Sequence, residues 1–285
     1  MKIGFFTVGF MPVWLRLFVG KTCGLMLHLI RFRREIVIAN LDIVFGEGKW
    51  PKSIIGKIYQ HFGHLAIEML YMPSIKNGSN MAEISGLENL DQALAKGQGA
   101  LVVSGHTGNW EMTAGSLASR GYKVHAVVKE LKGLDNDYLN NQLRGSKQVQ
   151  SIFKENAMLS IRRALKKNEV CLLVIDQHAK NKEAVKTHHF GFEASTYAAP
   201  YIISKRFSCP VVPAYSCRGK NLKDHFAHIY PEIPLVENDD PHEEARLNIS
   251  AYLKSLEDFI LAHPVQWIWM HDRWKVVRRK YKGQN

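Results

Sequence analysis

Short apolar segments that alternate with helical patterns constrain the fold of this chain more than any other feature. The segments 100–103, 124–128, 170–175 and 210–215 are rich in Val, Ile, Leu and Ala and are typical of buried strands. The segments around them are typical of helices: 52–72, 86–96, 155–167, 201–207 and 243–262. This alternation predicts an α/β domain with a mostly parallel central sheet flanked by helices on both faces.

Polar residues follow two of the predicted strands directly. After the first strand the chain reads Ser-Gly-His-Thr-Gly-Asn-Trp-Glu over residues 104–111, and Asp176-Gln177-His178 follows the third strand. In open α/β sheets, the loops at the carboxyl ends of the strands form the ligand crevice. The sequence therefore predicts a functional site at these two junctions.

His106 and Glu111 are the candidate catalytic pair at the first junction. On an unbroken helix, residues five apart point roughly 140° away from each other. The pair therefore works only if His106 lies in a turn and Glu111 in the first turn of a helix, and Gly105 and Gly108 supply the freedom for that turn. A carboxylate beside a histidine fixes its tautomer and stabilises the imidazolium, as a general base requires. The helix N-terminus offers N–H groups for an oxyanion or a phosphate. The spacing alone is also compatible with a structural role.

The net charge of +12 is concentrated at the two ends of the chain. Residues 1–34 hold six Lys/Arg and no acid, residues 271–285 hold six Lys/Arg and one acid, and the middle nets +1. Nucleic-acid binders usually carry basic residues on a recognition element among polar groups. Here the basic ends contain large apolar residues, which favours an anionic membrane surface over nucleic acid, with solvated tails as the alternative. These residues are Phe5, Phe6, Phe10, Trp14, Leu15, Leu17 and Phe18 in front, and Trp267, Trp269, Trp274 and Tyr281 behind.

The apolar run 3–30 is long enough to span a bilayer, but Pro12 divides it and Arg16 and Lys21 interrupt it. Because a charge at the middle of a spanning helix is costly, a helix that starts near Pro12 and lies in the interface fits better, and spanning stays open. No small-residue cleavage site of a signal peptide follows. We therefore divide the chain into a membrane-anchoring or interfacial segment, 1–34, and one domain, 35–285.

The cysteines and histidines indicate neither a disulfide framework nor a metal site. The four cysteines form no CxxC pair, which favours reduced thiols in a cytoplasmic setting. His178, His188 and His189 have no orderly ligand spacing, and His225 and His228, three apart in a strand-like run, are expected to face opposite sides. The sequence predicts no metal.

Residues 105–111 resemble the H-x4-D/E signature of the glycerolipid acyltransferase superfamily. The Gly-Asn-Trp-Glu run narrows the resemblance to the lipid A biosynthesis (lauroyl/myristoyl) acyltransferase family. Other segments resemble family elements in the same order: Asn40-Leu41 with Phe45, Asp176-Gln177 followed by Phe190-Gly191, 209–213, and the aromatic-basic ending 267–274. The resemblance covers nearly the whole chain, and the ordered set is far more specific than H-x4-E alone.

The resemblance implies an acyltransferase that needs no cofactor. The expected reaction moves a fatty acyl chain from a thioester, on acyl carrier protein or coenzyme A, to a hydroxyl of a membrane glycolipid. The family points to a lipid A precursor as acceptor and to the cytoplasmic face of a bacterial inner membrane.

The resemblance also assigns roles to residues. His106 is the expected base and Glu111 the carboxylate that orients it. Arg144, Asn109 and Gly108 are expected to bind the oxyanion or a substrate phosphate, although Arg144 also fits a surface arginine at a helix end. We expect a supporting role for Asp176 and Gln177, which brace the His106 loop.

Two departures from the family pattern leave the acceptor open. Gln148 stands where the family usually has a glycine, and His189 stands in place of the first Phe of a Phe-Phe-Gly element. Another glycolipid, a lysophospholipid or an amino-acid lipid as acceptor, and hydrolysis of acyl thioesters, are the enzymatic alternatives. A non-catalytic lipid- or nucleic-acid-binding protein is the alternative from a different class.

Overall fold

The computed structural model of the protein describes residues 8–75, 81–128, 143–144, 148–153, 157–180 and 184–282, the side chains of 279–282 excepted. Seven strands of the described chain form one sheet in the order β1-β9-β8-β2-β5-β3-β4. Neighbouring strands are parallel except for β8 and β9. The strands are β1 (Glu83–Ser85), β2 (Ala100–Ser104), β3 (Val124–Val128), β4 (Gln150–Phe153), β5 (Val170–Val174), β8 (Val211–Arg218) and β9 (His225–Ile229). The predicted mostly parallel sheet is confirmed.

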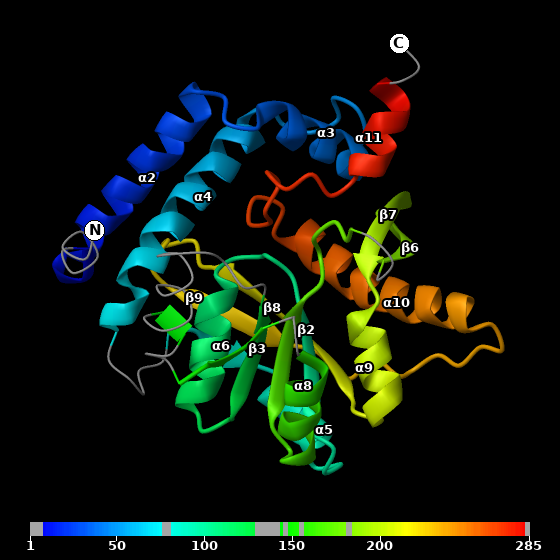
Figure 1. Ribbon diagram of the computed structural model, residues 1–285. Helices are drawn as coiled ribbons and strands as arrows, with labels where there is room; N and C mark the ends of the chain where they lie inside the picture. The colour runs from blue at the N-terminus through cyan, green and yellow to red at the C-terminus, as the bar shows by residue number, and fades with distance from the viewer. Residues whose placement is uncertain are drawn as a thin grey trace.

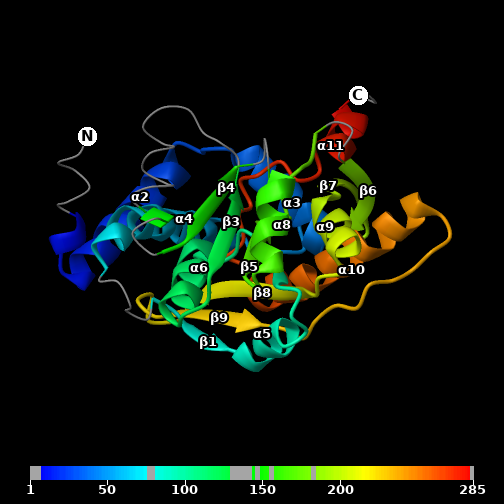
Figure 2. The ribbon, with the colours of Figure 1, turned by 60° about the horizontal axis from the view of Figure 1, so that its bottom comes forward.

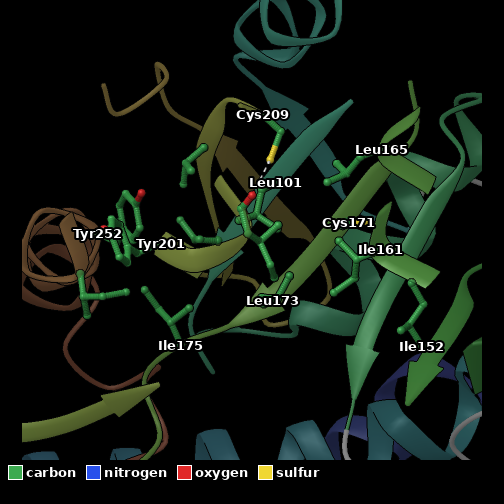
Figure 3. Close-up of a cluster of buried hydrophobic side chains, with 14 of the residues drawn as sticks. Leu101, Ile152, Ile161, Leu165, Cys171, Leu173, Ile175, Tyr201, Cys209 and Tyr252 are labelled. Carbon is green, nitrogen blue, oxygen red and sulfur yellow. Dashed lines mark hydrogen bonds between the residues drawn. The ribbon is translucent and has the colours of Figure 1, made fainter. Parts of the chain in front are cut away.

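Helices cover both faces of this sheet (Figures 1 and 2). On one face lie α8 (Ala157–Lys166), α9 (Ala199–Phe207) and α10 (Pro241–Ala262); on the other lie α5 (Leu87–Leu94) and α6 (Trp110–Ser119). Because successive strand residues point to opposite faces, Leu101 and Val103 pack toward α8, α9 and α10, whereas Val102 packs toward α5 and α6. Figure 3 shows the first of these cores, in which Leu101, Leu173 and Tyr252 are labelled.

The four predicted strands and five predicted helices are all present, with ends shifted by a few residues. His225 and His228 lie on β9. His225 Nε2 lies 3.4 Å from Glu68 Oε1, whereas His228 Nδ1 lies 2.8 Å from Ser85 Oγ, so their opposite facing is also confirmed. The following elements were not predicted: α3 (Arg34–Phe45), η1 (Met72–Ser74), β1, β4, the hairpin β6 (Ala184–His189) and β7 (Phe192–Tyr197), and α11 (Lys275–Lys282).

The N-terminal helix α2 (Val13–Leu29) begins directly after Pro12 and packs along α4 (Ser53–Tyr71), as Figure 1 shows. Glycines make this contact close: a Cβ on Gly63 would lie 2.2 Å from the Gly20 carbonyl oxygen and 2.8 Å from the Gly24 Cα. The opposite side of the segment leaves large apolar side chains exposed, with Trp14 at 68% and Phe18 at 63%. The described part of this segment, residues 8–34, is thus partly docked on the domain.

Within the described residues, no single helix is long and apolar enough to cross a membrane. The pair α2 and α3, bent by 93° at its break, meets the length and composition requirement only when the two helices are taken together.

Candidate active site

Strand register brings His106 and Asp176 together. β2 and β5 are adjacent and parallel, and Ser104 pairs with Val174, so both residues lie two positions beyond a matched pair. His106 Nδ1 lies 2.6 Å from Asp176 Oδ1, and the backbone N–H of His106 donates to Asp176 Oδ2 at 2.8 Å. Two contacts between one loop and one carboxylate fix both the position and the tautomer of the imidazole. The predicted bracing of the His106 loop by Asp176 matches this geometry.

Asp176 is fully buried, and burial by itself raises a carboxyl pKa. The charge of His106, the two hydrogen bonds from His106 and a 2.7 Å hydrogen bond from the Trp267 indole N–H outweigh burial and hold the pKa of Asp176 well below its usual range. Asp176 is therefore an anion that accepts the Nδ1 proton of His106. The lone pair of the neutral imidazole then lies on Nε2.

His106 Nε2 lies 3.3 Å from the side-chain nitrogen of Gln177, which donates to it. The indole of Trp110 packs edge-on against the imidazole, with ring centroids 4.6 Å apart. The His106 side chain keeps 16% exposure, in contrast to the 0% of Asp176. The basic nitrogen therefore lies at the less buried side of the pair, within reach of the Gln177 amide.

Glu111 does not make the hydrogen bond to His106 that the sequence predicted. It lies in the first turn of α6, as expected, but its carboxylate binds Arg144: Nε donates to Oε2 at 3.0 Å and Nη2 donates to Oε1. Both side chains are largely buried, at 6% and 11% exposure. The topology of the sheet explains the difference. β5 lies next to β2 and places Asp176 beside the imidazole, whereas α6 directs Glu111 to Arg144.

Asn109 and Gly108 are likewise not the free donors that an oxyanion site needs. The Gly108 N–H donates to the Gln266 carbonyl oxygen at 2.9 Å. Asn109 caps α6 by accepting from the Met112 N–H at 3.3 Å, and its Nδ2 donates to Glu68 Oε2 at 3.1 Å. Both groups are buried and already partnered, so they shape the turn instead of facing a substrate.

The two glycines of the turn are required for different reasons. Gly108 has φ +52°, and a Cβ there would lie 2.4 Å from the Ser216 carbonyl oxygen, so both conformation and space exclude a side chain. Gly105 is needed for space, because a Cβ would lie 2.6 Å from Leu256 Cδ1. The strand-turn-helix junction predicted at 104–111 is confirmed.

The C-terminal tryptophans pack behind the site and are not exposed at the surface. The predicted interfacial side chains Trp267, Trp269 and Trp274 are at most 1% exposed. Each indole N–H has a hydrogen-bond acceptor, in order Asp176 Oδ2, the Pro264 carbonyl and the His189 carbonyl. The Ile268 N–H also donates to the His106 carbonyl at 3.1 Å. The C-terminal segment therefore supports the His106 loop and Asp176.

Arg273 is a buried cation in the same segment, with 0% exposure. It donates to the Gln177 and Ser195 carbonyls at 3.0 and 2.7 Å, to Thr196 Oγ1 at 2.6 Å and to His189 Nδ1 at 3.3 Å. Burial lowers the pKa of Arg273 to about 10 and, followed by the charge of Arg273, lowers that of His189 well below its usual value. The cation thus holds the backbone at Gln177.

An apolar cavity of about 460 Å³ lies between α8, α9 and the carboxyl-terminal halves of β3 and β5. Its lining includes Val127, Leu173, Met158 and Ile203. It also includes Ile175, which immediately precedes Asp176 in the chain. Protein interiors are normally close-packed. An apolar cavity of this size beside a polar site is therefore suited to an apolar part of a ligand.

Sequence reasoning missed Trp267 and Arg273 as supports of the site, and also Glu68, Arg218 and Gln266. The resemblance included the 267–274 ending, but no local signal showed that it returns to the His106 loop. Among the described residues, no group of three or more His, Cys, Asp and Glu side chains is arranged to hold a metal ion.

Comparison with known proteins adds a relationship along nearly the whole chain. Residues 1–276 match the bacterial lipid A biosynthesis acyltransferase family. The chain is 23% identical over 289 residues to the lipid A biosynthesis palmitoleoyltransferase of Escherichia coli, covering 95% of this chain and 90% of that protein. It is 24% identical over 263 residues to the lipid A biosynthesis lauroyltransferase of the same organism, covering 89% and 83%. It is 21% identical over 238 residues to the phosphatidylinositol mannoside acyltransferase of Mycobacterium tuberculosis, covering 79% and 71%.

Proposed function

We propose that this chain, which belongs to the bacterial lipid A biosynthesis acyltransferase family, moves a fatty acyl chain from an acyl carrier protein thioester to a hydroxyl of a membrane glycolipid. Membership of the family makes the chain an acyltransferase with a lipid A-like acceptor. The carrier protein as donor and a lipid A precursor as acceptor are the proposal. The observation that carries it is the His106–Asp176 pair, whose basic Nε2 lies at the accessible side of the site.

The proposed reaction needs only this pair and the two substrates. The acceptor hydroxyl takes the position of the Gln177 amide and gives its proton to His106 Nε2 while its oxygen attacks the thioester carbonyl carbon. Asp176 stabilises the imidazolium that forms. The tetrahedral intermediate collapses, the carbon–sulfur bond breaks, and the thiolate leaves as a thiol after taking the proton from His106. The products are an ester and a free carrier thiol.

Arg144 is the proposed electrostatic partner of this reaction. Glu111 holds its guanidinium at the N-terminal end of α6, where the helix dipole also favours an anion. A guanidinium in this place suits either the developing oxyanion or a phosphate of the substrate. Glu111 then acts through Arg144 and not through His106.

The apolar cavity between α8 and α9 is the proposed location of the acyl chain. It is lined by aliphatic side chains and Tyr197, and Ile175 in its wall is followed in the chain by Asp176. We expect a donor whose acyl chain fills this cavity to present its thioester carbonyl at the Ile175 end of the cavity, toward His106. Aliphatic burial stabilises such a complex in proportion to the chain area removed from water.

The proposed location is the cytoplasmic face of a bacterial inner membrane, with the N-terminal segment as the peripheral or anchoring contact. Phe10, Trp14 and Phe18 expose apolar surface on a segment that also carries Arg31 and Arg34, a combination that suits an anionic lipid interface.

The test is acyl transfer by the purified full-length chain, with acyl carrier protein thioesters as donor, a lipid A precursor in detergent as acceptor, and mass spectrometry of the product. We expect His106→Ala to lower the rate by about 1,000-fold or more, because base and imidazolium stabilisation are lost together. His188→Ala, a change of the same type at an exposed position, is the control and retains the wild-type rate.

Three results would contradict parts of the proposal. Wild-type transfer by His106→Ala removes the assigned base. Release of free fatty acid at the same rate with and without acceptor indicates a thioester hydrolase instead. Faster transfer from coenzyme A thioesters than from the carrier protein changes the donor, and product formed only with another lipid changes the acceptor.

A further inference from the structure

A buried ion pair lies behind the 106–109 turn. This turn connects the His106–Asp176 pair to the Glu111–Arg144 pair. Glu68 on α4 and Arg218 at the end of β8 are 4% and 5% exposed. Arg218 Nε donates to Glu68 Oε1 at 2.7 Å, and Arg218 Nη2 lies 2.6 Å from the same oxygen. His61 accepts from Arg218 Nη1 at 2.7 Å. Neither charged residue touches His106 or Asp176 by a hydrogen bond.

The pair belongs to a closed circuit of hydrogen bonds that includes the turn. Glu68 Oε2 accepts from Asn109 Nδ2 at 3.1 Å, and Gly108, which precedes Asn109, donates its N–H to the Gln266 carbonyl at 2.9 Å. Gln266 Oε1 in turn accepts from the Arg218 N–H at 2.6 Å, and Gln266 Nε2 donates to the Arg218 carbonyl at 2.9 Å. Four separate parts of the chain, α4, the 106–109 turn, β8 and the C-terminal segment, therefore meet in one circuit.

The circuit surrounds the turn at its most constrained point. Gly108 has φ +52° and no room for a Cβ against the Ser216 carbonyl, two residues before Arg218. Ser216 Oγ also donates to the Thr107 carbonyl at 2.7 Å. The turn has His106 on one side and Glu111 on the other, so a shift of Asn109 changes the distance between the His106–Asp176 pair and the Glu111–Arg144 pair.

A buried ion pair is a costly way to stabilise a fold, because the loss of hydration can exceed the attraction between the charges. Apolar residues of similar volume often serve stability equally well. Here the charged groups supply hydrogen bonds of fixed direction. The two oxygens of the Glu68 carboxylate hold the Arg218 guanidinium and the Asn109 amide at the same time.

We infer that Glu68 and Arg218 are positioning residues for acyl transfer, which set the place of the Gly108–Asn109 turn and through it the separation of His106 from the Glu111–Arg144 pair. The inference rests on the proposed function, in which both pairs act on one reacting thioester. Misplacement of reacting groups by about 1 Å is enough to lower a rate by about 100-fold.

The test uses the double variant Glu68→Gln/Arg218→Met, which removes both charges together and leaves no unpaired ion buried. Transfer kinetics are measured with acyl carrier protein thioester and lipid A precursor, beside thermal unfolding. We expect kcat to fall by about 10- to 100-fold with KM for both substrates within about twofold of wild type, because the loss concerns geometry in the transition state and not binding.

The matched control is Lys205→Met/Glu244→Gln. It removes another ion pair with a buried carboxylate, at 2.8 Å between α9 and α10, outside the site. We expect wild-type kcat from this control even where its melting temperature falls. A wild-type kcat from Glu68→Gln/Arg218→Met, or equal rises in KM and falls in kcat in both double variants, would overturn the inference.

Asn109→Ser gives a second readout that does not depend on the charged pair. Serine keeps an oxygen for the cap of α6 but loses the amide N–H that donates to Glu68, and its hydroxyl ends one bond short of the position of that nitrogen. We expect kcat of this variant to fall, with no further fall when it is combined with Glu68→Gln/Arg218→Met, because both changes break one circuit. If the falls in kcat multiply when the changes are combined, the inference is wrong. If the double variant does not fold, an unchanged kcat in Asn109→Ser alone also overturns it. His106→Ala measured in parallel separates the cases: if it retains transfer, the proposed function fails; if only the circuit variants retain it, the positioning role alone fails.

Discussion

The two basic, aromatic ends of this chain look alike in sequence and differ completely in the structure. In the N-terminal segment, Phe10, Trp14 and Phe18 are 81%, 68% and 63% exposed. In the C-terminal segment, Trp267 and Trp274 are 1% and 0% exposed, and their indole N–H groups donate to Asp176 and to the His189 carbonyl. The composition of a segment therefore does not decide whether its aromatic side chains are buried. What decides it is whether the rest of the fold supplies acceptors for the indole N–H groups and apolar neighbours for the rings.

The largest expected contrast between the two ends concerns their arginines. Arg273→Ala removes a fully buried cation and leaves carbonyls of Gln177 and Ser195 without their donor, so we expect a loss of about 3 to 5 kcal/mol in the free energy of unfolding. Arg31→Ala, an exposed arginine of the other end, is the control and changes it by less than about 0.5 kcal/mol. Chemical denaturation measures both, and equal effects would remove the distinction between the ends.

The second prediction concerns the stability of the C-terminal segment in acid. Burial lowers the pKa of His271 from 6.5 to about 4, and its Nε2 accepts the His178 N–H at 2.9 Å. Because the folded-state pKa lies below the unfolded one, the neutral ring contributes stability that is present above pH 6.5 and is lost as the pH falls toward 4.

We therefore expect His271→Gln, whose amide oxygen can still accept, to flatten the fall in unfolding free energy between these pH values by about 3 kcal/mol. Denaturation at a series of pH values measures it. A variant that loses stability with acid as steeply as the wild type would show that another group causes the fall.

The third contrast compares one tryptophan from each end. Trp267→Phe removes the indole N–H that donates to Asp176 Oδ2 at 2.7 Å, and we expect a loss of about 1 to 2 kcal/mol in unfolding free energy together with a lower kcat. Trp14→Phe leaves both unchanged, because Trp14 is exposed. Since the indole helps to lower the pKa of Asp176, stability that is present above the ordinary carboxyl pKa should be lost at a higher pH in Trp267→Phe than in the wild type. Identical acid profiles would contradict the assigned contact.

The smallest expected effect on folding, and a sizeable one on membrane binding, comes from Trp14→Ser/Phe18→Ser. Both side chains are exposed, so we expect a change of at most about 0.5 kcal/mol in the free energy of unfolding. Sedimentation with vesicles that contain anionic lipid should show binding at least about tenfold weaker, since two large apolar side chains no longer enter the interface. Unchanged vesicle binding would show that the exposed aromatic side chains of this end do not contact lipid.

The sequence alone determined the elements that lie close together along the chain. The apolar runs at 100–103 and 170–175 predict strands, because a strand covered by helices on both faces of its sheet is apolar at every position. The turn at Gly105 and Gly108 follows from local geometry. The sequence therefore predicted that His106 and Asp176 follow two strands at one edge of the sheet, and the structure brings them together there.

Only the tertiary structure decided which of these residues act on one another. The hydrogen bond between His106 and Asp176 joins residues 70 apart and exists because β5 lies beside β2, and the circuit of Glu68, Arg218 and Gln266 joins four distant segments. Strand order and the return of the C-terminal segment depend on how whole faces pack, and no local pattern encodes that. For this reason the sequence paired His106 with its near neighbour Glu111 and placed the C-terminal tryptophans at a membrane, whereas the fold pairs His106 with Asp176 and buries the tryptophans behind it.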